Sequence, residues 1–423
     1  MVKEYALLFP GQGSQYVGMG REIYQRYAIV RELYKEAEEL LNIELAKLCF
    51  EGSFKELTKT ANTQPAILVT SVAMFKVFME ERETLPLFAA GHSLGEISAL
   101  ACSGVISFSD AVKAVRRRGI LMQEALSSSA GGMYAISGLT KEQVEEFLQT
   151  TPSLKDRIVV SNHNSPKQVT ISGFQDALEL AARELESRNS RVMKLKVSAP
   201  FHSPLMQPAF DQFRKELQSY SFNKFLFPVI SNVTARPYTD SINIADHLAL
   251  QMLRPVLWKD SMQFLNRNGI STIIDVGPQT IVKNLAVENV PGITTFALDK
   301  KNDRDSIQAW FMQSYGQSNY KTEPWIRRFV TQCLTESVCT KNNNWNEVEY
   351  QNGVLIPIER LQQILSQYQQ TSYPEKPEDA REALELLKLV MKTKKVPATE
   401  QSMRIKFLLA NIDGDILKEK VPN

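Results

Sequence analysis

The residues with the clearest chemical potential form the segment Gly91-His92-Ser93-Leu94-Gly95. It fits the GxSxG nucleophile elbow, in which flanking glycines allow a sharp turn between a strand and a helix. Such a turn presents the serine at a helix N-terminus, where free N–H groups can stabilise an oxyanion. The same pattern also occurs in Gly-rich turns without chemistry. Here the apolar run Phe88–Ala90 precedes it and a helical pattern follows over Glu96–Cys102, which favours nucleophilic catalysis by Ser93.

A nucleophilic serine needs a base, and the chain has four histidines. His92 adjoins the serine within the turn, so we expect its side chain to point elsewhere and to pack or hydrogen-bond locally. His163 lies in a polar segment predicted to be a turn, and both it and His247 are expected at the surface or in structural hydrogen bonds. His202 lies in the proline-flanked segment Pro200–Pro204, next to an expected cleft between subdomains, and is the preferred base. Spacing alone does not prove this choice.

A run of three arginines, Arg116–Arg118, lies in a helical pattern that starts near Ser109. Helical spacing gives both Arg118 and Arg116 an apolar side, so periodicity leaves open which guanidinium faces inward. An inward guanidinium could hold a carboxylate through two parallel hydrogen bonds, whereas lysine offers a point charge. A solvated basic helix face is the simpler interpretation for Arg116 and Arg117. The apolar neighbours are Ala111, Val115 and Met122 for Arg118, and Val112 and Ile120 for Arg116.

Short apolar runs predict the strands that position these residues. Strands are expected at Tyr5–Phe9, Phe88–Ala90 and Thr272–Val276, and helical patterns separate them. This alternation predicts an α/β fold with a largely parallel sheet.

The stretch from Gly131 to Val197 has a different rhythm, with the element order βαββαβ. That order is typical of a ferredoxin-like subdomain, which we interpret as an insertion into the larger α/β domain. After about Tyr320 the composition changes, and amphipathic helices are predicted at Leu361–Tyr368 and Pro377–Met391. The inserted elements are strands at Met133–Ser137, Ile158–Ser161, Gln168–Ser172 and Val192–Val197, with helices at Lys141–Gln149 and Ala177–Ser187.

Composition narrows the functional class. The chain has 423 residues, of which 43% are hydrophobic and 23% charged, so a globular protein of several domains is expected. A net charge of +2 gives no reason to expect nucleic acid or a membrane as partner. Four cysteines without metal-ligand spacing and only four histidines indicate neither a disulfide framework nor a metal site. With no signal-like N-terminus and no long apolar stretch, we expect a cytoplasmic protein.

Taken in order along the chain, several motifs resemble the malonyl-CoA:acyl carrier protein transacylase family, which includes polyketide-synthase acyltransferases. The resemblance covers roughly residues 1 to 315. It implies an α/β-hydrolase-like core at 1–130 and 198–318, a ferredoxin-like subdomain at 131–197, and a mainly helical extension at 319–423. The matching segments are Phe9–Gln15, Thr63–Ala66, Gly91–Gly95, Arg118-Gly119, Asn162–Pro166, Pro200–Pro204, Gln251–Trp258 and Asp275–Pro278.

The resemblance implies a role for individual residues. Ser93 would be the nucleophile and His202 its general base, held by the backbone carbonyl of Gln251 rather than by a carboxylate. The backbone N–H groups of Gln12 and Leu94 would form the oxyanion hole. Two further positions would line the active site, namely Gln64 and Asn162.

Two positions bear on the acyl group. The family match to Arg-Gly selects Arg118 as the ligand of the malonyl carboxylate. Phe201 stands where bacterial fatty-acid enzymes usually place serine, and it resembles polyketide acyltransferases that take malonyl rather than methylmalonyl groups. An aromatic ring there leaves little room for an α-methyl group, which binding typically discriminates by only ~1–3 kcal/mol. The alternative for Phe201 is simple packing.

The expected activity is therefore ping-pong transfer of malonyl from malonyl-CoA, through a Ser93 acyl-enzyme, to the phosphopantetheine thiol of an acyl carrier protein, with no metal or redox cofactor. The extension favours a trans-acting acyltransferase of polyketide biosynthesis. It could also be a linker from a larger synthase. The alternatives are a fatty-acid-synthesis transacylase, a hydrolase that clears stalled carrier proteins, a non-catalytic docking component, and a general esterase.

Overall fold

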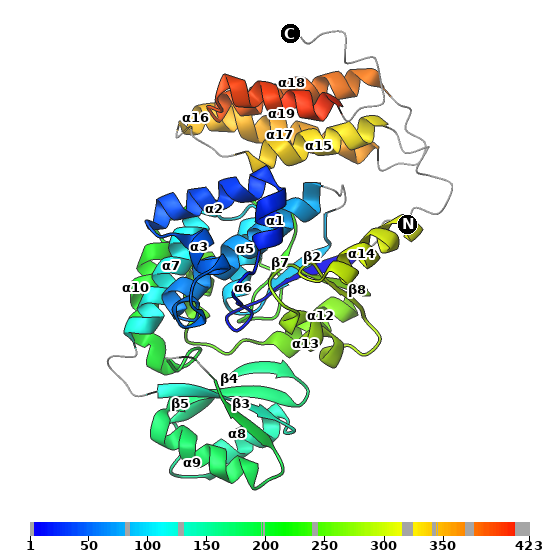
Figure 1. Ribbon diagram of the computed structural model, residues 1–423. Helices are drawn as coiled ribbons and strands as arrows, with labels where there is room; N and C mark the ends of the chain where they lie inside the picture. The colour runs from blue at the N-terminus through cyan, green and yellow to red at the C-terminus, as the bar shows by residue number, and fades with distance from the viewer. Residues whose placement is uncertain are drawn as a thin grey trace. The chain divides into compact units, whose positions relative to one another are not determined.

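The computed structural model describes residues 4–80, 85–125, 131–195, 197, 199–238, 244–314, 325–340, 344, 346–368 and 376–410 (Figure 1). The chain divides into two compact units, Val2–Phe311 and Met312–Asn423. The boundaries predicted at 130/131, 197/198 and 318/319 each involve at least one residue outside the described ones.

A parallel sheet forms the centre of the larger unit. Its strand order is β7-β2-β1-β8-β9, and every neighbouring pair is parallel. Strand β1 is buried along its whole length: Tyr5 and Phe9 join the apolar cluster on one face, and Leu8 joins the cluster on the other. Burial on both faces explains why these strands read as continuous apolar runs. The strands are β1 (Tyr5–Phe9), β2 (Phe88–Gly91), β7 (Val229–Ile230), β8 (Thr272–Asp275) and β9 (Thr294–Ala297).

Helices cover both faces of this sheet (Figure 1). Helices α2, α5, α6, α7 and α10 contribute to the larger apolar cluster, whereas α12 and α13 pack on the other side. Helix α7 begins at Phe108, close to the predicted start, because the Ser107 hydroxyl caps it by accepting from the Asp110 N–H at 3.0 Å. The helices are α1 (Arg21–Arg26), α2 (Ala28–Leu41), α3 (Leu45–Phe50), α4 (Phe54–Leu57), α5 (Thr60–Glu80), α6 (Leu94–Cys102), α7 (Phe108–Glu124), α10 (Gln207–Leu217), α11 (Ile244–Leu250), α12 (Trp258–Arg267), α13 (Ile281–Asn289) and α14 (Lys301–Ser314), with a 3₁₀ turn at Pro204–Met206.

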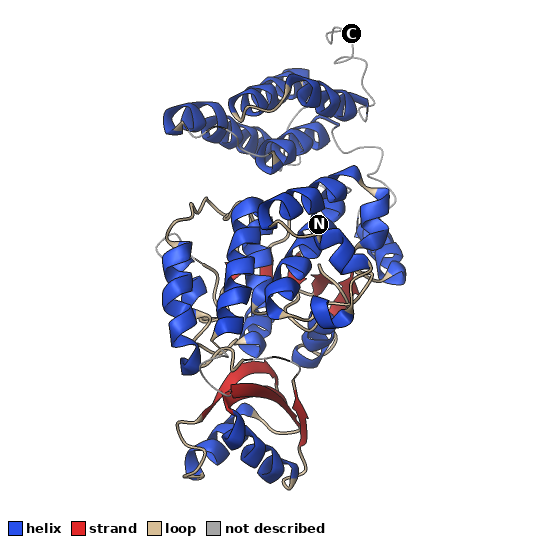
Figure 2. Cartoon of the chain, turned by 60° about the vertical axis from the view of Figure 1, so that its left-hand side comes forward, coloured by secondary structure: helices blue, strands red, loops and turns tan. Residues whose placement is uncertain are grey.

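The inserted stretch folds into a four-stranded antiparallel sheet of order β4-β5-β3-β6, with its two helices on one face (Figure 2). The element order is the predicted one. One local prediction is wrong: Asn162–Ser165 is not a turn but the end of β4, which stays paired with β5 through two register shifts. The elements are β3 (Gly131–Ser137), α8 (Lys141–Thr150), β4 (Ile158–Ser165), β5 (Gln168–Phe174), α9 (Gln175–Glu186) and β6 (Arg191–Lys194).

Each regular element in the described residues of the smaller unit is a helix, and the unit has its own apolar cluster, to which Phe329, Leu361 and Leu387 belong. Both predicted amphipathic helices are present. No helix in the described part of the chain combines the length and apolar character needed to cross a membrane. The helices are α15 (Trp325–Cys339), α16 (Glu347–Tyr350), α17 (Ile356–Gln367), α18 (Pro377–Thr393) and α19 (Ala398–Ala410), with a π-helical turn at Gln351–Leu355.

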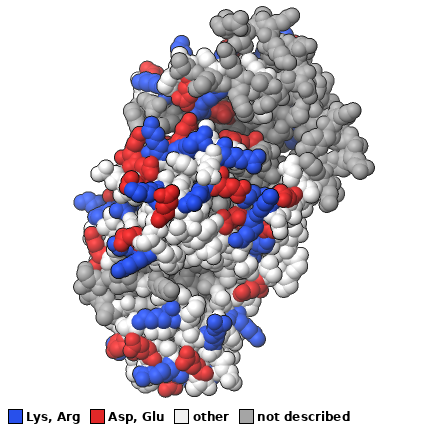
Figure 3. Space-filling model, in the orientation of Figure 1, with Lys and Arg blue, Asp and Glu red and all other residues white. Residues whose placement is uncertain are grey.

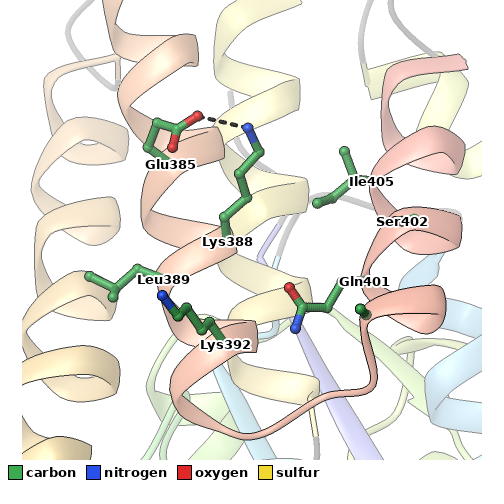
Figure 4. A pocket seen from close by; sticks show the side chains of 8 residues that line it. Glu385, Lys388, Leu389, Lys392, Gln401, Ser402 and Ile405 are labelled. Atoms are coloured by element: carbon green, nitrogen blue, oxygen red, sulfur yellow. Dashed lines mark hydrogen bonds and ion pairs between the residues drawn. The ribbon is translucent and has the colours of Figure 1, made fainter. Parts of the chain in front are cut away.

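A pocket lies between α18 and α19 (Figure 4). Lys388 in its wall pairs with Glu385 at 2.8 Å. Ser402 is the only hydroxyl-bearing residue in the lining, and no histidine accompanies it. The lining therefore offers no serine–base pair.

Candidate active site

Ser93 occupies a strained turn between β2 and α6. Its backbone has φ 51° and ψ −108°, which an L-residue rarely adopts. The flanking glycines are needed for close approach. A Cβ on Gly91 would lie 1.9 Å from the Gly95 backbone, and one on Gly95 would lie 2.1 Å from the Phe9 carbonyl oxygen. The glycines thus allow the tight packing, while the serine itself carries the unusual backbone.

The structure brings Ser93 and His202 together. The serine Oγ lies 2.8 Å from His202 Nε2, and His202 Nδ1 lies 2.7 Å from the backbone oxygen of Gln251. Because a carbonyl can only accept, Nδ1–H is the donor and Nε2 is left to accept the serine proton. Burial first, and the nearby Arg118 cation second, lower the pKa of His202 to about 3, so the imidazole is neutral at physiological pH.

Arg118 is buried beside the serine, 1% exposed, on the inner face of α7. One terminal nitrogen donates to Ser93 Oγ at 3.1 Å and to Gln251 Oε1 at 2.8 Å, and the other donates to Gln64 Oε1 at 3.0 Å. Burial lowers its pKa to about 10, so the guanidinium stays charged at neutral pH. Its Nε–H has no hydrogen-bond acceptor among the described residues. The site therefore holds a fixed cation with donor capacity to spare.

The neighbouring arginines have other partners. Arg116 is half-buried and donates to the Ala61 carbonyl and to Asn62 Oδ1, each at 2.7 Å. The solvated face expected for Arg116 is therefore wrong. Arg117 is also half-buried, and its guanidinium donates to Gln212 Oε1 at 3.0 Å. Geometry resolves what periodicity left open, since only Arg118 of the three reaches the serine.

Gln251 acts through both its backbone and its side chain. Its carbonyl holds His202, and its Nε2 donates to the Ser93 carbonyl at 3.0 Å and also to the Glu96 carboxylate. Its Oε1 accepts from Arg118. One residue therefore connects the serine, the histidine and the arginine.

Sequence reasoning missed two residues of this network. Asn232 accepts from the Ser93 N–H and donates to the Gly91 carbonyl, both at 2.7 Å, so it clamps the turn on either side of the serine. Glu96 is fully buried behind the turn. A sequence signal existed for Glu96, which is the only charged residue in the apolar helix α6. The sequence around Asn232 carries no comparable signal.

Two backbone N–H groups, one in each of the turns that follow β1 and β2, have no acceptor among the described residues. Leu94 is the first residue of α6, so its N–H has no intrahelical acceptor, and Gln12 lies in the turn after β1. The His92 N–H donates to the Phe9 carbonyl at 2.9 Å, which keeps the two turns side by side. The Gln12 side chain points to Thr60, with Nε2 3.3 Å from Oγ1.

Of the remaining predicted residues, some are hydrogen-bonded to this network and others are not. Gln64 is joined to it through Arg118. Asn162 is buried in β4 and accepts from the Ser161 hydroxyl at 3.1 Å, but no hydrogen bond links it to Ser93, His202 or Arg118. Phe201 is 5% exposed and belongs to the larger apolar cluster, directly before His202.

Two of the other histidines have structural contacts. His92 Nε2 lies 2.9 Å from Asn164 Oδ1 and its ring packs on Trp258, in agreement with the prediction. His163 is 4% exposed and faces Asp260 at 3.5 Å, so it is a buried residue and not a surface one. No group of three or more His, Cys, Asp or Glu among the described residues is placed to hold a metal ion.

The surface charges on the face drawn in Figure 3 do not indicate a strongly charged binding partner. Figure 3 shows Lys and Arg interspersed with Asp and Glu over the described residues visible on this face. The mixture agrees with the net charge of +2. Long-range attraction to a polyanion is not expected on this face.

Comparison with known proteins places this geometry in context. A family model described as "Acyl transferase domain" matches residues 6–305. A malonyl CoA-acyl carrier protein transacylase of Bacillus subtilis is 34% identical over 396 residues, covering 94% of this chain and 98% of the relative.

Solved structures give the same picture. A malonyl CoA-acyl carrier protein transacylase from Clostridium perfringens is 35% identical with a TM-score of 0.70, covering 74% of this chain and 98% of that one. A malonyl-transacylase in complex with a type II polyketide-synthase acyl carrier protein is also 35% identical, with a TM-score of 0.69 and coverage of 72% and 98%. The first relative thus extends over the smaller unit, which these structures do not match.

Proposed function

The chain belongs to the acyl transferase family, and from this membership we propose that it transfers malonyl groups from malonyl-CoA to the phosphopantetheine thiol of an acyl carrier protein. The observation that carries the proposal is the buried Arg118 guanidinium, which lies 3.1 Å from the Ser93 hydroxyl. An acyl group bound to Ser93 would have its free carboxylate within reach of this cation. Thioesters without a carboxylate lack that partner.

The first half-reaction loads the enzyme. His202 Nε2 takes the Ser93 hydroxyl proton as Oγ attacks the thioester carbonyl, forming a C–O bond. The N–H groups of Gln12 and Leu94 stabilise the resulting oxyanion. Collapse breaks the C–S bond, and the imidazolium returns its proton to the departing CoA thiolate. The Gln251 carbonyl supports the transient positive charge by accepting from Nδ1–H.

The second half-reaction runs the same steps with a new thiol. The phosphopantetheine thiol gives its proton to His202 and attacks the Ser93 ester. The proton then returns to Ser93 Oγ as the serine leaves, and the malonyl thioester of the carrier protein is released. Every proton and bond is accounted for by the chain and its two thiols, so the proposed reaction needs no cofactor.

Arg118 selects the acyl group in this account. Gln64 and Gln251 fix the plane of its guanidinium from two sides. A carboxylate can replace the Ser93 hydroxyl as acceptor and add further bonds, since charge-assisted hydrogen bonds are the strong ones. Phe201 would add selection against an α-methyl branch through volume, and Asn162 would line the site.

We also propose a fold class for each part of the larger unit. The order βαββαβ with strand order β4-β5-β3-β6 supports a ferredoxin-like subdomain at 131–197. The strained serine between β2 and α6 supports an α/β-hydrolase-like core at 1–130 and 198–318. The extension is assigned to 319–423.

The extension and Phe201 lead us to propose a trans-acting role in polyketide biosynthesis. Similarity to the transacylase solved with a polyketide-synthase carrier protein supports this role. Supply of malonyl groups for fatty-acid synthesis uses the same chemistry and is the second candidate. A carrier-protein hydrolase is disfavoured because Arg118 is retained.

Intact-protein mass spectrometry tests the function. Wild type, Ser93→Ala and Arg118→Ala are each incubated briefly with malonyl-CoA, methylmalonyl-CoA or acetyl-CoA. We expect a malonyl adduct on wild type, no adduct on Ser93→Ala, and little malonyl adduct on Arg118→Ala. Preferential acetyl loading of wild type, or no adduct with any donor, would contradict the proposal.

A further inference from the structure

Glu96 is a buried carboxylate that the reaction steps leave unused. It lies in the first turn of α6, three residues after Ser93, and is fully buried. Its Oε1 accepts from the Tyr238 hydroxyl and, at 3.2 Å, from the Asn232 N–H, while its Oε2 accepts from Gln251 Nε2. Burying a carboxylate costs free energy, which hydrogen bonds from three donors offset only in part. We therefore expect a role for Glu96 in the contacts that it makes.

Two acceptors fix which way the Gln251 amide faces: its Nε2 donates to the Glu96 carboxylate and, at 3.0 Å, to the Ser93 carbonyl. An ionised carboxylate can only accept hydrogen bonds, so the amide nitrogen must face Glu96. The amide oxygen is then turned toward Arg118, from which it accepts at 2.8 Å. With the amide reversed, an NH₂ group would face the guanidinium, and two donors would oppose each other.

Burial opposes the ionised form of Glu96, and its hydrogen-bond donors and Arg118 favour that form. Burial raises the pKa of Glu96 to about 7, while the hydrogen bonds from Tyr238 and Gln251 and the charge of Arg118 act in the opposite direction. Glu96 in turn favours the charged form of Arg118. The two buried charges therefore support each other across the Gln251 amide.

We propose that Glu96 is a positioning residue for acyl-group selection: its carboxylate orients the Gln251 amide so that Arg118 is held ready for the substrate carboxylate. This inference rests on the proposed function. Glu96 touches neither substrate nor the reacting atoms, so its effect is on the choice of acyl donor more than on the chemistry at Ser93.

The test compares Glu96→Gln with Tyr238→Phe as a matched control. Tyr238→Phe removes a donor to the same carboxylate but leaves the contact between Glu96 and Gln251. Formation of the acyl-enzyme is followed with malonyl-CoA and with acetyl-CoA, and kcat and KM are separated for each donor. Thermal melting reports whether each variant is folded.

We expect Glu96→Gln to lower kcat/KM for malonyl-CoA about tenfold or more, mainly through KM, since hydrogen bonds to charged groups carry that much energy. Loading from acetyl-CoA should change about threefold at most. Tyr238→Phe should affect both donors by the same small factor. Proportional loss with both donors, or no loss, in folded Glu96→Gln would overturn the proposal.

Gln251→Leu serves as a second variant, because it keeps the backbone carbonyl that holds His202 and removes the amide that contacts Glu96, Arg118 and the Ser93 carbonyl. It should reproduce the selective loss with malonyl-CoA, and the double variant should be no worse than either single one. If Glu96→Gln does not fold, Gln251→Leu decides the matter, and equal loss with both donors would refute the proposal. A wild type without preference for malonyl-CoA would instead refute the proposed function.

Discussion

The two units of the chain each bury a cation, and they use it differently. Arg118 in the larger unit is surrounded by side chains, and its partners include the Ser93 hydroxyl and two glutamine oxygens. Lys394 in the smaller unit, 3% exposed, donates to the backbone carbonyls of Ser337 and Thr340, each at 2.8 Å. These carbonyls lie at the C-terminal end of α15, where cations satisfy free acceptors.

The difference teaches how to interpret a buried charge. The last backbone carbonyls of a helix have no intrahelical donor, so Lys394 caps the C-terminal end of α15. The partners of Arg118 are side chains, including that of Ser93, and its Nε–H has no acceptor in the described part of the chain. We infer that chemistry belongs to the larger unit and that the described part of the smaller unit contributes stability.

Replacing the base should give the largest effect. His202→Ala removes the acceptor of the Ser93 proton, and we expect acyl-enzyme formation to fall ~10³-fold or more. His247→Gln, in α11, is the matched control and should load at close to the wild-type rate. Rapid-quench measurement of the malonyl adduct checks both. Equal loss in the two variants would place the effect in folding rather than in proton transfer.

Replacing the selective cation should give a smaller and donor-specific effect. Arg118→Lys keeps the charge but loses the fork that pairs with Gln64 and Gln251, so malonyl loading should fall about 10–100-fold. Acetyl loading should stay within a few-fold of wild type. Arg117→Lys is the control, because Arg117 contacts Gln212 and not the serine, and it should change neither rate. An Arg118→Lys variant with wild-type malonyl kinetics would remove the contrast between the two buried cations.

The sequence predicted part of the larger unit and nothing about Lys394. The apolar run Tyr5–Phe9 predicts β1 because both faces of that strand are buried. The helical stripe of α7 left both Arg116 and Arg118 as inward candidates, and the resemblance to Arg-Gly selected Arg118. What local pattern could not supply is the meeting of Glu96, Asn232 and Gln251, since these residues come from separate segments and are joined by the tertiary fold.

The prediction of a turn at the end of β4 was wrong for a related reason. The segment Asn162–Ser165 is polar and precedes a proline, which are turn signals. Pairing with β5 on one side and with Val256 on the other overrides these signals, since the His163 N–H donates to the Val256 carbonyl at 2.9 Å. A polar sequence can therefore remain in a strand where the fold provides its hydrogen bonds.

Replacing the structural cation should alter stability and not chemistry. Lys394→Met leaves the last carbonyls of α15 without this donor, and we expect unfolding of the smaller unit to be easier by about 1–3 kcal/mol. Lys388→Met, in the pocket wall of Figure 4, removes a partly exposed pair and should cost at most about 1 kcal/mol. Chemical denaturation measures both, and acyl-enzyme formation should be unchanged. Loss of loading in folded Lys394→Met would contradict this division of labour.

The smallest expected effect is that of lowering the pH to 5 on acyl loading, because His202 stays neutral. The pKa of His202 is lowered from 6.5 to about 3, so the imidazole stays neutral at pH 5 and acetyl loading should be nearly constant from pH 8 to 5. The native state binds fewer protons than the unfolded chain between these pKa values. The contribution of neutral His202 to the free energy of unfolding is therefore present above pH 6.5 and is lost as the pH falls toward 3. A loading rate that falls with a midpoint near 6.5 would show an ordinary histidine.

The central claim is that Ser93 carries the malonyl group between two thiols. The most direct measurement isolates the enzyme after malonyl-CoA treatment, adds a holo acyl carrier protein, and follows both proteins by peptide mass spectrometry. We predict that malonyl is first found on the peptide containing Ser93 and then moves to the phosphopantetheine arm. Malonyl on any other residue, or its loss to water without appearing on the carrier protein, would contradict the account.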